Sequence, residues 1–393
     1  MINQGVIHEF KGTHYEMGFQ QGQIFKHATQ EMLDIFLDLD DIKALKPWFL
    51  PKNLFLRISS KKAFNAFQPI VEKYAPNQAQ RIKGLSEGSG LKEETLYLFS
   101  AAELMLAELD WELPHLKSGC TSIAYQGDIT ESGHTMVSRN FDYARFIVPF
   151  LMLRTNRPQG LNATYDLTAM VLPGTFNGLN EHGVFISTDE AFPLDEIEEG
   201  LSASLLIQEA LETCKSTEEV VEFFTNSARG SGNVILIADS EDDVRVMEYT
   251  SKQIHVRNPS PGDNFIVGTN HYTIDELKPI DLPREAIFGK KSPKPLRGIC
   301  INETSYVRKD IAERLIRNAD QIDLNFIKAL HRDHSVNPKG VGGMETLCHH
   351  DPINISAASM IMDLKNFNAW ICLGLPCKNN YKSYNLKSNG NEK

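Results

Sequence analysis

The segment SGCTSIAY at residues 118–125 marks a change in the pattern of the sequence. From about residue 15 to 110, apolar side chains recur at a spacing of three to four residues, and this spacing predicts helices. Beyond the segment, short apolar runs rich in β-branched residues predict strands. We therefore expect a mainly helical region at 1–119 and a strand-rich region at 120–393.

The strand-rich region also contains helical patterns. Strands in series, interrupted by pairs of helices, indicate a layered α+β body. A polar turn at 240–243 favours antiparallel pairing of its neighbours. The sequence after Cys377 is rich in Asn and Lys, and we expect a mobile tail after about residue 380. The predicted strands are TSIAY, TMVSR, YDLTAMVL, GVFIST, NVILIADS, VRVMEYT, FIVGT, SMIMDL and AWICLGL, and the predicted helices are 202–213, 217–226, 307–317 and 324–331.

The overall charge limits the partners that the chain can have. It contains 40 Lys and Arg against 51 Asp and Glu, a formal net charge of −11. Nucleic acids and anionic membranes require a concentrated basic face, so we expect neither as a partner. The sequence contains no stretch of 18 consecutive apolar residues, so we expect no membrane insertion. The first 22 residues do not resemble a signal peptide, so we expect a cytoplasmic protein with six reduced cysteines.

The dipeptide Gly119-Cys120 has two interpretations. In the first, Cys120 is a small buried residue that opens a core strand. In the second, the thiol attacks the carbonyl of Gly119, and water then releases Cys120 as a new N-terminal residue. Glycine tolerates the close approach that this attack requires. The freed α-amine, with a pKa of about 7.7–8.0, would serve as the general base beside the thiol.

Polar residues at the ends of predicted strands are candidates for the same site. Arg139 would place a cation against the thiolate, and Asp142 would place a carboxylate against the α-ammonium. The alternative is a surface Arg–Asp pair that adds little to stability. Asn270 follows the run FIVG, and its amide would donate to an oxyanion. His271 suggests a papain-like Cys/His pair, although no CGSCW-like segment surrounds Cys120.

Several Cys and His residues near the C-terminus resemble zinc ligands, but their spacing matches neither HExxH nor a paired CxxC. We therefore predict no metal site and no cofactor, and glycine-rich nucleotide-binding motifs are also incomplete. The residues considered as zinc ligands are His331, His334, Cys348, His349, His350, Asp351, Cys372 and Cys377.

Taken together, these segments resemble the C45 peptidase family, in order and over nearly the whole chain. Its best-known activity is that of acyl-coenzyme A:6-aminopenicillanic-acid acyltransferase, and it is related to choloylglycine hydrolases and acid-ceramidase-like amidases. The segments are GTHYEMGFQQG at 12–22, GCTS at 119–122, SRNFDY at 138–143, NGLNEHGVFIST at 177–188, TNHY at 269–272, SYVRKDIAERL at 305–315, LCHHD at 347–351 and SMIMDL…AWICLGLPC at 359–377.

The resemblance implies an N-terminal-nucleophile hydrolase with a four-layer αββα fold, made as a precursor that cleaves itself before Cys120. By position, Cys120 is the nucleophile, and Arg139 and Asp142 orient it and balance its charge. Asn270 resembles the oxyanion or substrate-positioning Asn. Arg308 resembles a later active-site Arg, through a short Ser-x-x-Arg match.

The expected function is amide hydrolysis or acyl transfer through an acyl-Cys120 intermediate, on a small-molecule acyl amide or thioester. The fragment 1–119 would stay bound as a non-covalent subunit, because its release would expose an apolar face. One departure stands out: where related enzymes often place an Asn donor, this chain has Asp189 and Glu190. An ionised carboxylate cannot donate a hydrogen bond to an oxyanion. A weak or inactive member that binds an acyl ligand is therefore the alternative.

Overall fold

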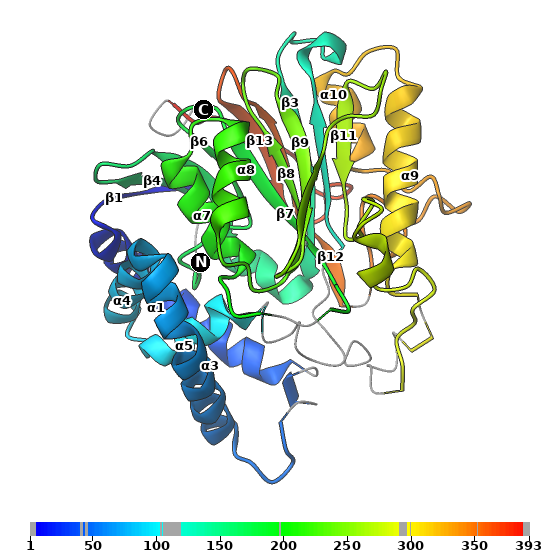
Figure 1. The fold of residues 1–393 in the computed structure, drawn as a ribbon. Coiled ribbons are helices and arrows are strands. Elements are labelled where there is room, and N and C mark those ends of the chain that lie inside the picture. The colour runs from blue at the N-terminus through cyan, green and yellow to red at the C-terminus, as the bar shows by residue number, and fades with distance from the viewer. Residues whose placement is uncertain are drawn as a thin grey trace.

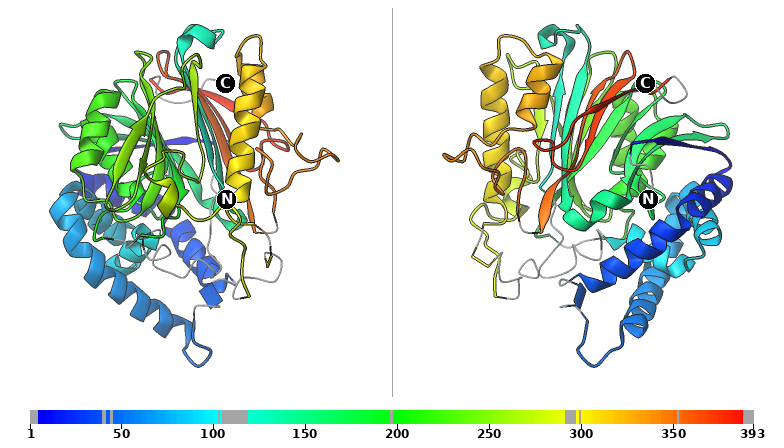
Figure 2. Two further views of the ribbon diagram at one scale, coloured as in Figure 1. Left: turned by 45° about the vertical axis from the view of Figure 1, so that its right-hand side comes forward. Right: turned by 180° about the vertical axis from the view of Figure 1, so that it is seen from behind.

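Two β-sheets packed against each other occupy the centre of the molecule (Figures 1 and 2). This computed structural model describes residues 5–39, 42–43, 46–102, 104, 119–195, 198–290, 297–298, 300–351 and 353–387. In spatial order, the eight-stranded sheet contains β1 (Ile7–Gly12), β4 (Leu151–Pro158), β5 (Thr164–Ala169), β6 (Asn177–Asn180), β7 (Phe185–Ala191), β8 (Gly232–Ala238), β9 (Val244–Tyr249) and β10 (Ile254–Arg257). The six-stranded sheet contains β11 (Phe265–Gly268), β2 (Thr121–Tyr125), β3 (Met136–Ala144), β12 (Asn354–Asp363), β13 (Asn368–Leu373) and β14 (Lys382–Asn385).

Helices cover the outer face of each sheet. The helices α7 (Ala203–Thr213) and α8 (Thr217–Asn226) pack on the eight-stranded sheet. The helices α9 (Glu303–Arg317) and α10 (Leu324–Leu330) cover the six-stranded sheet (Figure 1). Buried Ile311 of α9 and Ile327 of α10 belong to one apolar cluster with Ile123 of β2. This order of layers confirms the predicted αββα architecture.

The described part of the region before Cys120 is mainly helical, and it also supplies one strand. Its described helices are α1 (His14–Asp38), α3 (Lys52–Tyr74), α4 (Pro76–Ser89) and α5 (Glu93–Ser100). Glycines let α1 and α4 pack closely, since a Cβ at Gly18 would lie 2.1 Å from the backbone oxygen of Arg81. The unpredicted β1 pairs in parallel with β4 at the edge of the eight-stranded sheet. The N-terminal region is therefore built into the same body as the later strands.

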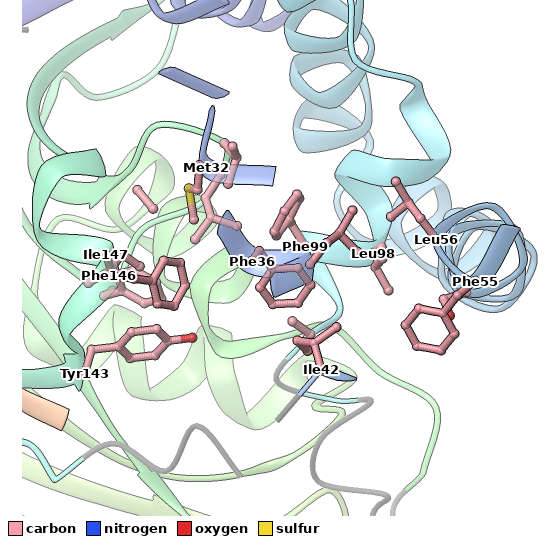
Figure 3. Close-up of a pocket in the computed structure, with 17 residues that line it drawn as sticks. Met32, Phe36, Ile42, Phe55, Leu56, Leu98, Phe99, Tyr143, Phe146 and Ile147 are labelled. Atoms are coloured by element: carbon pink, nitrogen blue, oxygen red, sulfur yellow. The ribbon is translucent and has the colours of Figure 1, made fainter. Parts of the chain in front are cut away.

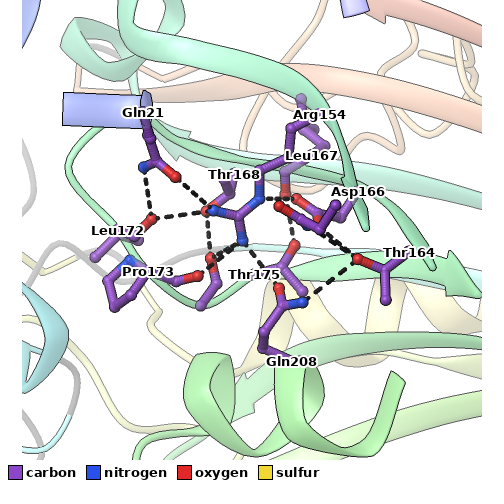
Figure 4. A network of polar contacts seen from close by, with 12 residues as sticks. Gln21, Arg154, Thr164, Asp166, Leu167, Thr168, Leu172, Pro173, Thr175 and Gln208 are labelled. Carbon is purple, nitrogen blue, oxygen red and sulfur yellow. Dashed lines mark hydrogen bonds and ion pairs between the residues drawn. The ribbon is translucent and has the colours of Figure 1, made fainter. Parts of the chain in front are cut away.

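A buried arginine on β4 connects α1 to the eight-stranded sheet (Figure 4). Each guanidinium nitrogen of Arg154 donates to at least one acceptor, and Gln21 of α1 is among the acceptors. Gln21 also donates to the backbone oxygen of Met170 at 2.9 Å. We call this the Arg154 network. The acceptors of Arg154 are Asp166 Oδ1 (2.7 Å), Gln21 Oε1 (3.0 Å), Gln208 Oε1 (2.9 Å) and the backbone oxygens of Leu172, Pro173 and Gly174.

The predicted strands and helices all occur, with shifted ends, but β1, β4, β6, β10 and β14 were not predicted. The turn at 240–243 joins antiparallel β8 and β9, as expected. Residues 382–385, within the tail that we expected to be mobile, form β14 and pair with β13. Residues 388–393 of that tail lie outside the described residues.

Candidate active site

Cys120 lies immediately before β2 and is 1% exposed. Arg139 and Asp142 belong to β3 on one side of β2, and Asn270 follows β11 on the other side. Both neighbours run antiparallel to β2, so their ends meet its beginning at one edge of the sheet. Arg308 of α9 reaches the same edge. The fold thus brings the five predicted residues into one group, which we call the Cys120 site.

The thiol of Cys120 is held between a cation and a backbone carbonyl. Arg139 Nη2 lies 3.3 Å from Cys120 Sγ, and the sulfur lies 3.8 Å from the backbone oxygen of Asp142. Burial raises the pKa of the thiol to about 11, while Arg139 acts in the opposite direction. In the intact chain, Cys120 is therefore a neutral thiol at pH 7, and it needs a base to become a nucleophile.

The carboxylate of Asp142 is satisfied on one side. Its Oδ1 accepts a hydrogen bond from Ser356 Oγ at 2.6 Å, whereas its buried Oδ2 has no hydrogen-bond partner among the described residues. Burial raises the pKa of this carboxyl to about 6. A Cβ at Gly119 would lie 3.4 Å from Oδ2. The unpaired oxygen therefore lies close to the Gly119–Cys120 junction.

Arg308 links Cys120 to Asn270. Its Nη1 donates to the backbone oxygen of Cys120 and to Thr121 Oγ1 at 2.8 Å. Its Nη2 donates to Asn270 Oδ1 at 2.9 Å. These bonds fix the amide of Asn270, whose Nδ2 donates to the backbone oxygen of Glu190 at 2.9 Å. Since an amide nitrogen carries two donors, one contact leaves a second N–H for another acceptor.

The two carboxylates of β7 have different surroundings. Asp189 is fully buried, its Oδ1 accepts from Ser122 Oγ at 2.9 Å, and it lies 3.7 Å from Arg139 Nε. Burial raises the pKa of Asp189 to about 6, against the effect of Arg139. Glu190 instead lines the cavity beside Cys120. Asp189 is thus a counter-charge for Arg139, and its side chain is already engaged away from the cavity.

His271 is engaged with α9. Its Nδ1 lies 2.7 Å from Ser305 Oγ, and its ring stacks on Tyr306 with centroids 3.7 Å apart. Burial lowers the pKa of its imidazole far below the usual range, which makes it a poor base. Within the described part of the chain, no hydrogen bond joins His271 to Cys120. The geometry does not favour the papain-like pair.

Sequence reasoning missed residues that support Asp142. The backbone N–H of His349 donates to Ser356 Oγ at 2.9 Å, and His349 Nε2 lies 2.8 Å from Asp351 Oδ2. A Cβ at Gly119 would lie 3.4 Å from His349 Nδ1. The segment LCHHD contributed to the resemblance without a role for either residue. Arg139 has three further acceptors, Phe176 O (2.9 Å), Asn177 Oδ1 (2.8 Å) and Thr188 O.

The sulfur of Cys120 lines a cavity of about 90 Å³, which adjoins a larger apolar cavity of about 300 Å³ (Figure 3). The larger cavity lies between the N-terminal helices and the first strands after Cys120. Met32 and Phe36 of α1 and Leu56 of α3 face Tyr143 and Phe146 across it. The two cavities share Phe99, Ala102, Tyr143, Leu172 and Phe176. An apolar group can therefore extend from Cys120 into the larger cavity.

Four of the residues considered as zinc ligands come together in space, although their spacing in the sequence matched no template. The possible ligand atoms of His334, Cys348, His350 and Cys377 all lie within 4.8 Å of one another. His331, His349, Asp351 and Cys372 are not part of this group.

Comparison with known proteins identifies the family. Residues 129–332, just over half of the chain, match the family described as "Acyl-coenzyme A:6-aminopenicillanic acid acyl-transferase". The chain belongs to this acyltransferase family. Membership confirms the resemblance to the C45 peptidases, and the αββα layers are those expected of an N-terminal-nucleophile hydrolase.

A curated relative of this acyltransferase-family chain is the Beta-alanyl-dopamine/carcinine hydrolase of Drosophila melanogaster. The two are 26% identical over 189 residues, which are 45% of this chain and 46% of the relative. The chain therefore spans less than half of the length of the relative that it matches.

Three solved structures resemble part of this chain. A Caenorhabditis elegans ortholog of N-acylethanolamine-hydrolyzing acid amidase is 15% identical, with a TM-score of 0.40, over 62% of this chain and 93% of its own. A variant of the conjugated bile acid hydrolase from Clostridium perfringens is 15% identical, with a TM-score of 0.43, over 68% and 97%. The penicillin V acylase from Agrobacterium tumefaciens is 17% identical, with a TM-score of 0.43, over 69% and 87%.

Helices of sufficient length and apolarity to cross a bilayer are absent from the residues that the structure describes.

Proposed function

We propose that this protein is a self-processing cysteine amidohydrolase and acyltransferase that acts on amides with an apolar acyl group. One observation carries the proposal: Cys120 lines a small cavity that adjoins an apolar one, and it follows a glycine that is close to an unpaired carboxylate oxygen. The first feature suits an acyl substrate, and the second suits a new α-ammonium group.

The first reaction is cleavage of the chain. Cys120 Sγ attacks the carbonyl carbon of Gly119, a C–S bond replaces the peptide C–N bond, and the thiol proton moves to the departing nitrogen. Water then hydrolyses the thioester and frees the carboxyl group of Gly119. The new α-ammonium forms near Asp142 Oδ2, which supplies the negative charge that it needs.

The second reaction is turnover. The α-amine of Cys120 takes the thiol proton, and the thiolate attacks the carbonyl carbon of the substrate. The second N–H of Asn270 stabilises the oxyanion, and the amine product leaves with the proton. Water, or an acceptor amine, then releases the acyl group from sulfur. Arg139 and Arg308 act as positioning residues, the first for the sulfur and the second for Asn270.

The fragment 1–119 remains bound after cleavage in this proposal, with residues 120–393 as the catalytic domain. Strand β1 is paired with β4 over six residues, and His14 Nε2 lies 2.8 Å from Glu212 Oε2 on α7. Gln21 is part of the Arg154 network. The fragment also supplies most walls of the acyl cavity, through α1, α3 and α5.

The cavity favours an apolar acyl group over a charged one. The Drosophila relative is named for hydrolysis of β-alanyl-dopamine and carcinine. A β-alanyl group carries an ammonium, and its transfer to the apolar cavity of about 300 Å³ would be costly without a paired charge. Each methylene that the cavity buries contributes about 0.8 kcal/mol, or roughly fourfold in kcat/KM.

The test begins with the intact mass and the N-terminal sequence of the purified protein. We expect two fragments, 1–119 and 120–393, the second beginning Cys-Thr-Ser, which elute together on size exclusion. Aminomethylcoumarin amides of acetyl, hexanoyl, decanoyl and β-alanyl groups then measure the acyl preference. We expect kcat/KM to rise from acetyl to decanoyl and to be low for β-alanyl.

Cys120→Ala abolishes cleavage and turnover in this proposal, and Cys214→Ala, which removes another buried thiol that lines neither cavity, retains both. Hydrolysis by Cys120→Ala at the wild-type rate would contradict the mechanism. A single uncleaved chain that no thiol-directed acyl probe labels would favour the alternative, a binding protein without catalysis. Preference for the β-alanyl amide would contradict only the assignment of the cavity to an apolar acyl group, and not the mechanism.

A further inference from the structure

A group of Cys and His side chains lies outside the Cys120 site. His334 belongs to the turn after α10, Cys348 and His350 to the segment before β12, and Cys377 to the turn after β13. The Sγ atoms of Cys348 and Cys377 lie 3.3 Å and 3.4 Å from His350 Nε2. The rings of His334 and His350 are nearly perpendicular, with centroids 4.9 Å apart. Two loops, the connection from α10 to β12 and the turn after β13, therefore converge on one point.

These distances suit a tetrahedral metal ion. Zinc binds thiolate sulfur at about 2.3 Å and imidazole nitrogen at about 2.0–2.1 Å, so adjacent S and N ligands lie roughly 3.6 Å apart. The observed S–N separations of 3.3 Å and 3.4 Å are close to that edge. His334 Nε2 is buried and has no hydrogen-bond partner among the described residues, as expected of a nitrogen that binds a metal ion.

A backbone hydrogen bond and a glycine hold the side chains of this group in position. The N–H of Cys348 donates to the backbone oxygen of Asp333, which fixes the position of Cys348 beside His334. The ring of His350 packs on Gly342, where a Cβ would lie 2.1 Å from His350 Cδ2. Glycine is thus required at 342 for His350 to hold its place.

We propose that His334, Cys348, His350 and Cys377 bind one Zn²⁺ ion as a closed structural site. Two thiolates and two imidazoles form a complete ligand set with no open position, which is typical of structural rather than catalytic zinc. Zinc displaces the two thiol protons, and the two thiolates balance the charge of the ion within a partly buried group. Mixed sulfur and nitrogen ligands favour zinc over magnesium or calcium.

The zinc site would stabilise the segment that supports Asp142. His350 follows His349, whose N–H donates to Ser356 Oγ, and Ser356 donates to Asp142 Oδ1. Binding of the metal would therefore restrict a loop that is two hydrogen bonds from the carboxylate. This inference does not depend on the proposed function, because metal content is measured without any substrate.

The experiment measures zinc by inductively coupled plasma mass spectrometry in the full-length protein, after saturation with Zn²⁺ and dialysis. We expect about one zinc per chain in the wild type and a loss of at least about tenfold in Cys348→Ser/Cys377→Ser. Cys372→Ser, which changes a nearby buried thiol outside the group, should retain the zinc. Equal zinc in the double variant and the wild type, or no zinc in the wild type, would overturn the proposal.

A second measurement uses the wild type alone, in case the double variant does not fold. With Co²⁺ in place of Zn²⁺, we expect the absorption bands of tetrahedral cobalt with thiolate ligands. Iodoacetamide should modify Cys348 and Cys377 only after a chelator is added, and the half-buried Cys300 should react in both cases. A mass lower by two hydrogens, traced to a Cys348–Cys377 disulfide, would overturn the zinc site in favour of a redox pair.

Discussion

Two of the buried arginine–carboxylate groups in this chain are satisfied to different degrees. In the Arg154 network, every guanidinium nitrogen donates to an acceptor. In the Cys120 site, four buried atoms have no hydrogen-bond partner among the described residues. They are Nε of Arg139, Nε of Arg308, Oδ2 of Asp142 and Oδ2 of Asp189. Both groups are almost completely buried, so burial does not explain the difference.

The difference is in keeping with a structural role for the Arg154 network and with the reactive role that we propose for the Cys120 site. A completely paired network costs free energy to disturb, and the Arg154 network connects α1 to the sheet. A group with unpaired buried atoms stores unused hydrogen-bonding capacity, which the protein tolerates where bonds change during a reaction. Unpaired atoms beside Cys120 are therefore in keeping with the proposed cleavage and turnover.

The largest expected effect is on stability, in the Arg154 network. Arg154→Met leaves Asp166 as an uncompensated buried charge and removes the bond to Gln21, so we expect a loss of about 3–5 kcal/mol. Urea denaturation measures the loss in the Cys120→Ala background, where both proteins are single chains. Arg139→Met in that background should cost less, and the reverse order would contradict the comparison.

The next effect is on activity, at Asp142. Asp142→Asn cannot balance the α-ammonium, and we expect cleavage and turnover to slow by about 10²–10³-fold. Its stability should stay equal or rise, because burial already raises the pKa of this carboxyl to about 6. The rate at which fragment 120–393 forms, with a melting curve, gives both quantities. Asp166→Asn is the matched control, with lower stability and little change in the cleavage rate.

The third effect is a dependence of stability on pH, from Asp189. Its pKa is raised from 3.8 to about 6, so its contribution to stability is present below pH 3.8 and is lost as the pH rises through 6. Arg139, Arg308, Ser122 and Asp142 act on this carboxyl. In the Cys120→Ala background, we expect Asp189→Asn to be more stable than its parent by about 2–3 kcal/mol at pH 7.5.

Urea denaturation at pH 4 and at pH 7.5 checks this prediction. The advantage of Asp189→Asn should nearly disappear at pH 4, where the parent carboxyl is largely protonated. An equal difference at both pH values would show that the Arg139–Asp189 contact fully offsets the cost of burying the charge, and would contradict the raised pKa.

The smallest effect concerns an exposed pair, Arg284 and Glu303. Both side chains are more than a third exposed, although Arg284 Nη2 lies only 2.8 Å from Glu303 Oε1. Water screens such a pair, and we expect Arg284→Gln to change the free energy of unfolding by less than about 1 kcal/mol. A loss comparable to that of Arg154→Met would mean that pairing alone, rather than burial, sets the size of the effect.

The sequence predicted strands whose buried positions are apolar and missed those whose buried positions are polar. Strand β8 reads GNVILIA and was readily predicted. Strand β4 reads LMLRTNRP, and its buried Arg154 and Asn156 resemble loop residues until their distant partners are known. Strand β1 reads IHEFKG, and it is stabilised by parallel pairing with residues some 145 positions later. Local pattern contains neither kind of information.

The same limit of local pattern separates the site residues that were predicted from those that were missed. Cys120 and Asn270 lie at strand ends that the apolar runs reveal, and Arg139 and Asp142 lie on β3, the strand predicted next to that of Cys120, so their grouping was predictable. Ser356 lies within β12 and resembles any small residue of a buried strand, and its contact with Asp142 requires the pairing of β12 with β3. The four Cys and His residues come from two loops, and spacing along the chain does not report their convergence.

The pairing of β1 with β4 makes the kinetics of refolding depend on whether the chain has been cleaved. While the chain is continuous, the two strands find each other at a cost set by loop closure, independent of concentration. Once the chain is cut before Cys120, the same pairing becomes a bimolecular encounter. The cleaved protein would then regain its structure at a rate that increases with its own concentration, whereas Cys120→Ala would not.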